Sequence, residues 1–222
     1  MSIAQRIQEL KHSLPSEVTL VAVSKFHPVE ALQAAYDAGQ RVFGESRAQE
    51  LVAKQRQLPA DIEWHFIGTL QSNKVKEIVP FISLIHSVDS LRLLQEIEKQ
   101  AAKVNRVIRV LLEIHVAQEE TKHGLTPGAC KQLLANEAVA NLSHVRICGL
   151  MGMATNTDDE EQIKAEFHQI HLLFSELKDG LCRGNPDFTL LSMGMSHDYP
   201  LAIAEGSNLV RVGTYIFGER VY

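Results

Sequence analysis

The sequence contains little of what builds a disulfide scaffold or a structural metal centre. Its three cysteines, Cys130, Cys148 and Cys182, are odd in number and far apart, and none has a neighbour at metal-ligand spacing. We therefore expect reduced thiols in a cytoplasmic protein that binds no metal. The histidines do not change this expectation, because His168 and His171 lie three positions apart with no third ligand beside them.

Long apolar runs and an excess of basic residues are also absent. No apolar stretch approaches the roughly 18–20 residues of a membrane-spanning helix. The formal net charge is −5, whereas nucleic-acid binding requires clustered Lys and Arg. The first segment, Met1 to Ser13, is polar with periodic apolar residues, which predicts a surface helix in place of a signal peptide. The sequence thus predicts a globular protein that binds neither membranes nor nucleic acid.

What the chain does contain is a regular alternation of short strand-like runs with longer amphipathic stretches. No linker or low-complexity segment interrupts this alternation, so we expect one domain over residues 1–222. The predicted strands are Thr19–Ser24, Arg41–Gly44, Glu63–Gly68, Leu84–Ser87, Val107–His115, Val145–Met151, Thr189–Met193 and Leu209–Ile216. The predicted helices between them are Pro28–Ala38, Ser46–Gln57, Asn73–Val79, Ser90–Asn105, Pro127–Asn136, Asp158–Lys178 and Tyr199–Glu205.

This alternation indicates an α/β fold. Strands that alternate strictly with helices must run parallel and be joined by right-handed crossovers. Eight such units favour a closed (β/α)8 TIM barrel over an open doubly wound sheet. We therefore expect a single barrel, with the first segment as an extra N-terminal helix.

In such a barrel, functional residues lie at the C-terminal ends of the strands. Lys25 has this position, directly after the small apolar run that begins at Val21. By itself the position is typical of a solvent-exposed lysine at a strand end. Inside a barrel mouth, however, burial disfavours the ammonium form and makes the amine nucleophilic toward an aldehyde. The second interpretation depends on an anion site opposite the lysine.

Two neighbouring loops supply residues for an anion site. Ser192, Gly194 and Ser196 follow the seventh predicted strand, where hydroxyls and backbone N–H groups at a helix start can cradle a phosphate. Gly213 and Thr214 follow in the next strand and can give further N–H donors. A phosphate site formed by the loops after strands seven and eight recurs in this fold.

Arg211 shares a strand face with Gly213, because side chains alternate along a strand with a period of two. A phosphate cradle with a lysine one strand further round the ring predicts a phosphorylated aldehyde as the ligand. From these residues alone, two interpretations stay open. One is a Schiff-base aldolase acting on a sugar phosphate, and the other is a protein that holds pyridoxal 5′-phosphate (PLP).

Seven stretches spread along the chain form a more specific pattern. They are Leu20-Val21-Ala22-Val23-Ser24-Lys25, Phe43-Gly44-Glu45, His65-Phe66-Ile67-Gly68-Thr69-Leu70-Gln71-Ser72-Asn73-Lys74, Gly149-Leu150-Met151, Leu191-Ser192-Met193-Gly194-Met195-Ser196, Val210-Arg211-Val212-Gly213-Thr214 and Ile216-Phe217-Gly218. With these stretches the chain resembles the pyridoxal phosphate homeostasis protein family over nearly its whole length. Any one of them alone is a weak signal, whereas together they are specific.

The resemblance implies the barrel of the alanine racemase N-terminal domain (PLP fold type III), with the cofactor bound as a Schiff base to Lys25. It implies phosphate contacts from Ser192, Gly194, Gly213 and Thr214. It also implies that Arg211 faces the pyridine nitrogen. A carboxylate there would keep that nitrogen protonated, whereas a permanently charged Arg disfavours protonation and weakens the ring as an electron sink.

We therefore expect a binding protein for intracellular PLP (vitamin B6) homeostasis and amino-acid and keto-acid balance, with no catalytic residue. The chain ends at Tyr222, before a second β-domain of the racemase type, and it shows no second base for the opposite face of a substrate carbon. The alternative is a minimal PLP-dependent racemase or decarboxylase. Expected partners are PLP and either PLP-dependent apoenzymes or a regulatory protein, with a monomer as the default state.

Three places depart from the family pattern. Phe26 and His27 stand where Thr and Lys are frequent, Ser46 stands in place of Asn, and His115 stands in place of Asn. The departures leave contact of Ser46 with the cofactor ring and a role for His27 open. His65 lies on a predicted strand, and we expect an interior or mouth histidine with one hydrogen bond in preference to an acid–base catalyst.

Overall fold

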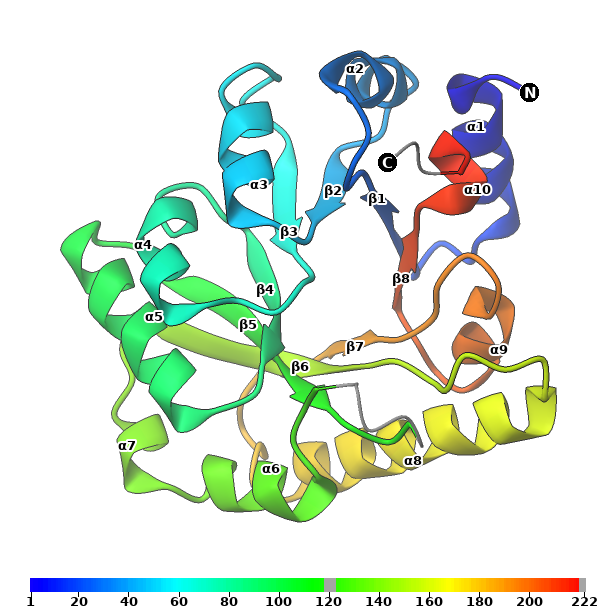
Figure 1. Cartoon of the computed structure of the whole chain (residues 1–222). Coiled ribbons are helices and arrows are strands. Elements are labelled where there is room, and N and C mark those ends of the chain that lie inside the picture. Colours follow the sequence, from blue (N-terminus) through cyan, green and yellow to red (C-terminus); the bar gives the residue numbers. More distant parts are fainter. Residues whose placement is uncertain (118–122, 220–222) are drawn as a thin grey trace.

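The computed structural model describes residues 1–117 and 123–219, and its central feature is a closed barrel of eight parallel strands (Figure 1). The strands are hydrogen-bonded in sequence order, and β8 pairs with β1 to close the ring, with Val21 opposite Arg211. The predicted α/β barrel is thus confirmed. The strands are β1 (Thr19–Val23), β2 (Val42–Glu45), β3 (Glu63–Phe66), β4 (Leu84–Val88), β5 (Ile108–Ile114), β6 (Val145–Gly152), β7 (Leu190–Ser192) and β8 (Leu209–Val212).

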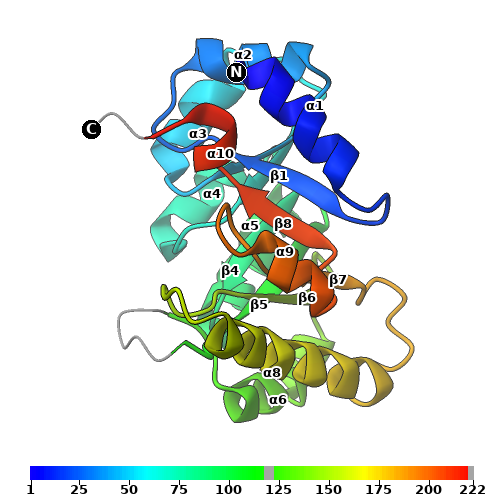
Figure 2. The ribbon, with the colours of Figure 1, turned by 90° about the vertical axis from the view of Figure 1, so that its right-hand side faces the viewer.

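Helices surround the barrel, as two perpendicular views show (Figures 1 and 2). They are α1 (Ile3–Ser13), α2 (Val29–Asp37), α3 (Ala48–Gln55), η1 (Ser72–Lys74), α4 (Val75–Ile78), α5 (Leu91–Lys103), α6 (Pro127–Leu134), α7 (Glu137–Ala140), α8 (Glu160–Asp179), α9 (Tyr199–Ala204) and α10 (Thr214–Phe217). Across residues 1–117 and 123–219, none of these helices combines the length and apolar character needed to cross a membrane.

The extra N-terminal helix α1 is present and packs against α2 and α10. Its start is capped by Ser2, whose hydroxyl accepts the Gln5 N–H while the Gln5 side chain accepts the Ser2 N–H. Arg6 Nη1 donates to the carbonyl of Ile216 at 3.2 Å. Helix α1 is therefore joined to α10, the helix that follows β8.

The side chains inside the barrel form an apolar layer and, further along the barrel axis, a polar layer. Alternate strand residues point inward. Six of them form one buried apolar cluster, namely Val21, Leu84, Leu111, Cys148, Met151 and Leu209. Further along the strands, His86 on β4 is hydrogen-bonded to Ser192 on β7, and because β4 and β7 are not neighbours this bond crosses the interior. The polar layer lies toward the C-terminal ends of the strands, where a barrel places its site.

The structure corrects the predicted end of the last strand. The pattern predicts a strand over Leu209–Ile216, but β8 ends at Val212 and α10 begins at Thr214. The carbonyl of Gly213 accepts the N–H groups of Ile216 and Phe217, each at 2.9 Å, so the chain turns into a helix there. This turn, and not a longer strand, buries the apolar Ile216.

Two helix boundaries also differ from the prediction. The helix predicted over Pro127–Asn136 ends at Leu134, because the Asn136 side chain accepts the Ala138 N–H and starts the separate helix α7. The helix predicted over Asp158–Lys178 begins at Glu160, because the Asp159 side chain accepts the N–H groups of Glu161 and Gln162 and caps it. The remaining differences are shifts of a few residues at element ends, where the terminal hydrogen bonds are weakest.

Candidate functional site

The C-terminal ends of the strands surround a cavity of about 230 Å³. The predicted site residues that line it are Lys25, Ser196, Arg211, Gly213 and Thr214. Its other lining residues are Val23, Ile67, Met153, Met195 and His197. Five of the seven residues predicted to bind the cofactor, drawn from loops far apart in the chain, therefore share one cavity.

Lys25 follows β1 and is half-buried at the edge of this cavity. The next residue, Phe26, has φ +69°, a left-handed conformation that bulky residues rarely adopt. Such a backbone is retained only where its surroundings hold it in place. Lys25 is therefore followed by a sharp turn whose backbone conformation depends on contacts with the surrounding residues.

Gly194 lies in the loop after β7 and has φ +90°. A Cβ atom there would lie 2.7 Å from Cβ of Ala202 and 2.8 Å from Cα of Tyr199, so only glycine fits between this loop and α9. Gly194 itself is buried beside the cavity, and its carbonyl accepts the Arg211 N–H at 3.0 Å. Gly194 thus allows the loop after β7 to pack closely against α9 and β8.

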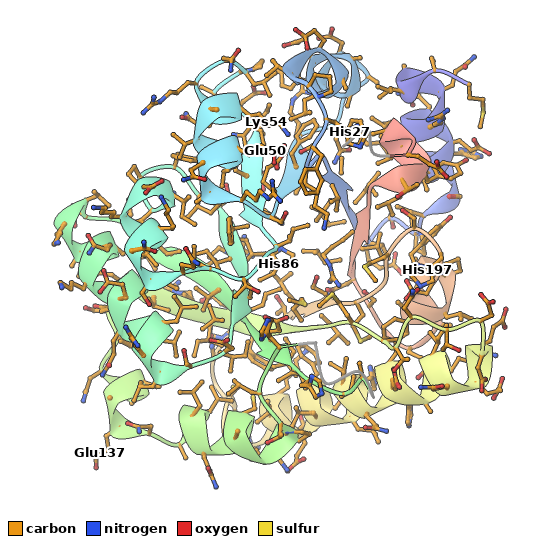
Figure 3. All side chains as sticks on the ribbon, in the orientation of Figure 1. His27, Glu50, Lys54, His86, Glu137 and His197 are labelled. Atoms are coloured by element: carbon orange, nitrogen blue, oxygen red, sulfur yellow. The ribbon has the colours of Figure 1, made fainter. Side chains whose placement is uncertain are left out.

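The loops after β7 and β8 are joined to each other at the cavity. The Gly213 N–H donates to the Ser196 hydroxyl at 3.2 Å. Asp198 Oδ1 accepts the Met195 N–H at 2.6 Å and Oδ2 lies 3.3 Å from His197 Nε2, which shapes the turn before α9. In Figure 3, His197 lies beside α9 on the side of the barrel where these loops end. Hydroxyl and N–H groups of two loops thus gather on one wall.

Arg211 places a buried cation on the same cavity. Its guanidinium donates from Nη1 to the Ser192 carbonyl at 2.9 Å and to the Ser192 hydroxyl at 2.6 Å, and from Nη2 to the Gly152 carbonyl at 3.1 Å. Burial lowers its pKa to about 10, while the charges of Asp198 and Glu113 act in the opposite direction. Among the described residues no carboxylate forms an ion pair with Arg211, so the group suits an anionic ligand.

Ser192, also predicted to contact phosphate, lies under the cavity wall and is fully buried. Its hydroxyl accepts from Arg211 and lies 3.1 Å from His86 Nδ1, and His86 Nε2 lies 3.0 Å from His65 Nδ1. The Ser192 hydroxyl has one proton to donate, and among the described residues His86 Nδ1 is the nitrogen placed to accept it, so we assign the proton to this bond. We infer that His86 carries its proton on Nε2 and donates it to His65.

Burial lowers the pKa of His65 to about 3 and the pKa of His86 well below its usual value, which keeps both rings neutral. His65 is thus an interior histidine hydrogen-bonded to another ring. His86, at the centre of the barrel in Figure 3, was not singled out from the sequence. The sequence feature that could have indicated an interior position for His86 is its spacing of two from Leu84, which places both side chains on the same face of the strand.

The structure separates three other residues from this cavity. Ser46 lines a different cavity of about 310 Å³ between α3 and the segment after β3. The His27 ring stacks on Phe217 with centroids 5.0 Å apart. His115 has a buried Nδ1 atom with no hydrogen-bond partner within the described ranges.

The fold and the site together define a barrel of the alanine racemase type, with Lys25 and the loops after β7 and β8 around one cavity at its mouth. The family model described as "Alanine racemase, N-terminal domain" matches residues 1–221. Alanine racemase of Clostridium difficile shares the fold with a TM-score of 0.76 at 14% identity, over 98% of this chain and 56% of that one.

Proteins with higher sequence identity to this chain identify its family within the alanine racemase fold. The pyridoxal phosphate homeostasis protein of Aquifex aeolicus is 43% identical over 205 residues, which cover 91% of this chain and 87% of that protein. The structure of PipY from Synechococcus elongatus without PLP is 40% identical with a TM-score of 0.92, over 98% of this chain and 100% of PipY. The structure of PipY with PLP bound is 39% identical with a TM-score of 0.88, over the same shares. The chain belongs to the pyridoxal phosphate homeostasis protein family.

Proposed function

We propose that this protein binds pyridoxal 5′-phosphate as a Schiff base on Lys25 and acts in PLP homeostasis. The observation that carries the proposal is one cavity bordered by both the half-buried Lys25 and the buried Arg211, which has no carboxylate partner among the described residues. The amine is the group that an aldehyde requires, and the buried guanidinium can donate to a ring nitrogen that carries no proton. The PLP-bound structure of PipY and the names of the relatives support this ligand.

Each residue has a separate role in the proposal. Ser196, Gly213 and Thr214 bind the phosphate from the wall formed by the β7 and β8 loops, and Gly194 holds these loops together. Ser192 acts from below the wall, through its contact with Arg211.

PLP, when bound, supplies an aldehyde that a lysine amine attacks and a ring that withdraws electrons. Arg211 faces the pyridine nitrogen in our proposal, and its positive charge disfavours protonation of that nitrogen and so limits carbanion chemistry.

We place the protein among cofactor carriers and not among dedicated catalysts. A racemase needs a base on each face of the substrate carbon. The titratable side chains lining the cavity in the described part of the chain are Lys25, Arg211 and His197, and His197 lies on the phosphate-binding wall beside Asp198. The proposal includes a single-domain, cytoplasmic monomer that passes PLP to apoenzymes or answers to a regulatory protein.

The proposal is tested by the absorption spectrum of the untreated protein, followed by borohydride reduction and peptide mapping. We expect a yellow protein whose Schiff-base band disappears in Lys25→Ala, with the reduced cofactor on the peptide that contains Lys25. A band that survives in Lys25→Ala, or label on another lysine, overturns the assignment. Trapping of a sugar phosphate with no chromophore supports the aldolase alternative, and Lys25-dependent turnover at a substrate Cα supports the racemase or decarboxylase alternative.

A further inference from the structure

We propose that Glu45 and Lys54, which are buried, and the partly exposed Glu50 form a cluster on β2 and α3 whose members are positioning residues that hold the backbone on both sides of Lys25. This inference rests on the proposed function, because it assigns the cluster a task in cofactor binding. The sequence pattern did not single out Glu50 or Lys54. The signal available was their spacing of four residues on one helix, which brings the two side chains together.

The ammonium group of Lys54 is the centre of the cluster. It donates to the Ser24 carbonyl at 2.7 Å, to Glu45 Oε1 at 2.7 Å and to Glu50 Oε1 at 2.6 Å. An ammonium group has three N–H donors, so these three bonds use its whole capacity and fix its direction. Only 6% of the Lys54 side chain is exposed, which removes the competition from water that weakens surface pairs.

Ser24, the residue before Lys25, is held at every polar atom. Its N–H donates to the Gly44 carbonyl at 3.0 Å and its hydroxyl donates to Glu45 Oε1 at 2.6 Å. Its carbonyl accepts from Lys54. Because Ser24 is also fully buried, the peptide that leads into Lys25 has a single position set by β2 and α3.

Phe26, the residue after Lys25, is held by the same cluster. Its N–H donates to Glu50 Oε1 at 2.6 Å. Its ring lies under the guanidinium of Arg47, 4.6 Å from the ring centroid. These two contacts hold the left-handed φ of +69°, which a free Phe would leave for a relaxed conformation. Figure 3 shows Glu50 and Lys54 next to each other between α3 and the chain near His27.

Burying these ionisable residues costs desolvation free energy that apolar residues would not cost. Burial raises the pKa of Glu45 to about 7 despite the nearby Lys54, and Glu45 Oε2 has no hydrogen-bond partner in the described part of the chain. Apolar residues of similar volume often stabilise a core at least as well as a buried ion cluster. A role in placing Lys25 explains why charged residues occupy this position, since the reacting amine gains effective concentration when its backbone is fixed.

Glu50 offers the cleanest test, because its removal leaves Lys54 paired with Glu45. We compare wild type with Glu50→Ala and Glu50→Gln in the full chain. The control is Glu176→Gln, which alters the Lys131–Glu176 pair, whose side chains are 40% and 61% exposed. Without cofactor, amide hydrogen exchange at Phe26 should accelerate in Glu50→Ala and recover partly in Glu50→Gln, whose side-chain oxygen still accepts a hydrogen bond.

With cofactor, titration of the Schiff-base band should show PLP binding about tenfold weaker in Glu50→Ala, the effect of one lost charge-assisted hydrogen bond. Binding of pyridoxine 5′-phosphate, which carries an alcohol in place of the aldehyde, should be unchanged, because it does not use the Lys25 amine. Equal PLP affinity in wild type and Glu50→Ala, or a parallel loss for both ligands, overturns the positioning role. A wild type that forms no Schiff-base band overturns the proposed function as well.

Discussion

Nη1 of Arg211 lies 2.6 Å from the hydroxyl oxygen of Ser192, inside the barrel and under the cavity wall. The same hydroxyl also lies 3.1 Å from His86 Nδ1, so both polar neighbours of Ser192 are interior side chains. Ser192 was predicted from the sequence as a phosphate ligand together with Ser196. Of these two serines only Ser196 lines the cavity, so their substitution should have different consequences.

The first prediction separates these two serines. Ser192→Ala removes a hydroxyl that a buried arginine and a buried histidine both use, and we expect a loss of about 1–3 kcal/mol in the free energy of unfolding. Ser196→Ala should lower stability by less but weaken inorganic phosphate binding several-fold. Urea unfolding and phosphate titration of both variants measure this. A larger loss of phosphate affinity in Ser192→Ala than in Ser196→Ala contradicts the assignment.

The second prediction concerns the charge of Arg211. In Arg211→Glu a carboxylate replaces the cation and should favour a protonated pyridine nitrogen, so the bound cofactor should exchange the Cα proton of added amino acids faster than in wild type. Deuterium incorporation followed by NMR measures the rate. Arg211→Gln, which removes the charge without reversing it, is the control and should lie between the two. Unchanged absorption and exchange in Arg211→Glu would place Arg211 away from the ring nitrogen.

The third prediction is a pH dependence from Glu45, whose pKa is raised by burial from 4.5 to about 7. The folded state then holds the proton more tightly than the unfolded chain. The stability that this proton contributes is complete below about pH 4.5 and is lost as pH rises through 7. A shift of this size corresponds to about 3 kcal/mol.

The measurement is urea unfolding of wild type and Glu45→Gln from about pH 5 to pH 8. The stability of wild type relative to the variant should fall across this range, because the glutamine does not titrate. A difference that stays constant with pH shows that Glu45 has the same protonation state in the folded and unfolded chain.

The fourth prediction concerns His65 and His86. The pKa of His65 is lowered to about 3, so the stability from its neutral form is present above its ordinary pKa of 6.5 and is lost as pH falls toward 3. In ¹⁵N NMR spectra at about pH 5, both rings should be neutral and protonated on Nε2. In Ser192→Ala the donor to His86 is lost, and the single tautomer of His86 should be lost with it. A protonated imidazolium at either position at pH 5 contradicts this arrangement.

The fifth prediction tests the barrel at β6. Gly149 has φ +152°, and a Cβ atom there would lie 1.7 Å from the Leu190 carbonyl oxygen. Gly149→Ala should therefore reduce the free energy of unfolding by at least about 3 kcal/mol, since the backbone of β7 must move. Gly128→Ala is the matched control. It lies in α6 with no atom within 4 Å of the added methyl, and it should stabilise by about 0.5–1 kcal/mol. Equal stability of the two variants contradicts the close contact between β6 and β7.

The architecture could be read from the sequence, because strand and helix periods are local properties of a chain. Alternating apolar runs predicted the eight strands, and Lys25 and Gly194 were predicted at strand ends because barrels place their sites there. The end of β8 was predicted wrongly. The apolar run through Ile216 is equally consistent with a strand and with a buried helical turn, and period alone does not separate them.

Which interior side chains meet depends on how the strands close into the ring. The period of two predicts that a residue points inward, but it does not name the partner across the barrel. The bond between His86 and Ser192 joins residues 106 positions apart, and its existence depends on how the ring closes and staggers. The same holds for Lys54, whose ammonium contacts Ser24 only because α3 packs where β1 and β2 end. The position of Lys25 at the end of β1 follows from local sequence pattern, whereas the groups that hold its backbone and the guanidinium of Arg211 on the neighbouring strand follow from three-dimensional packing.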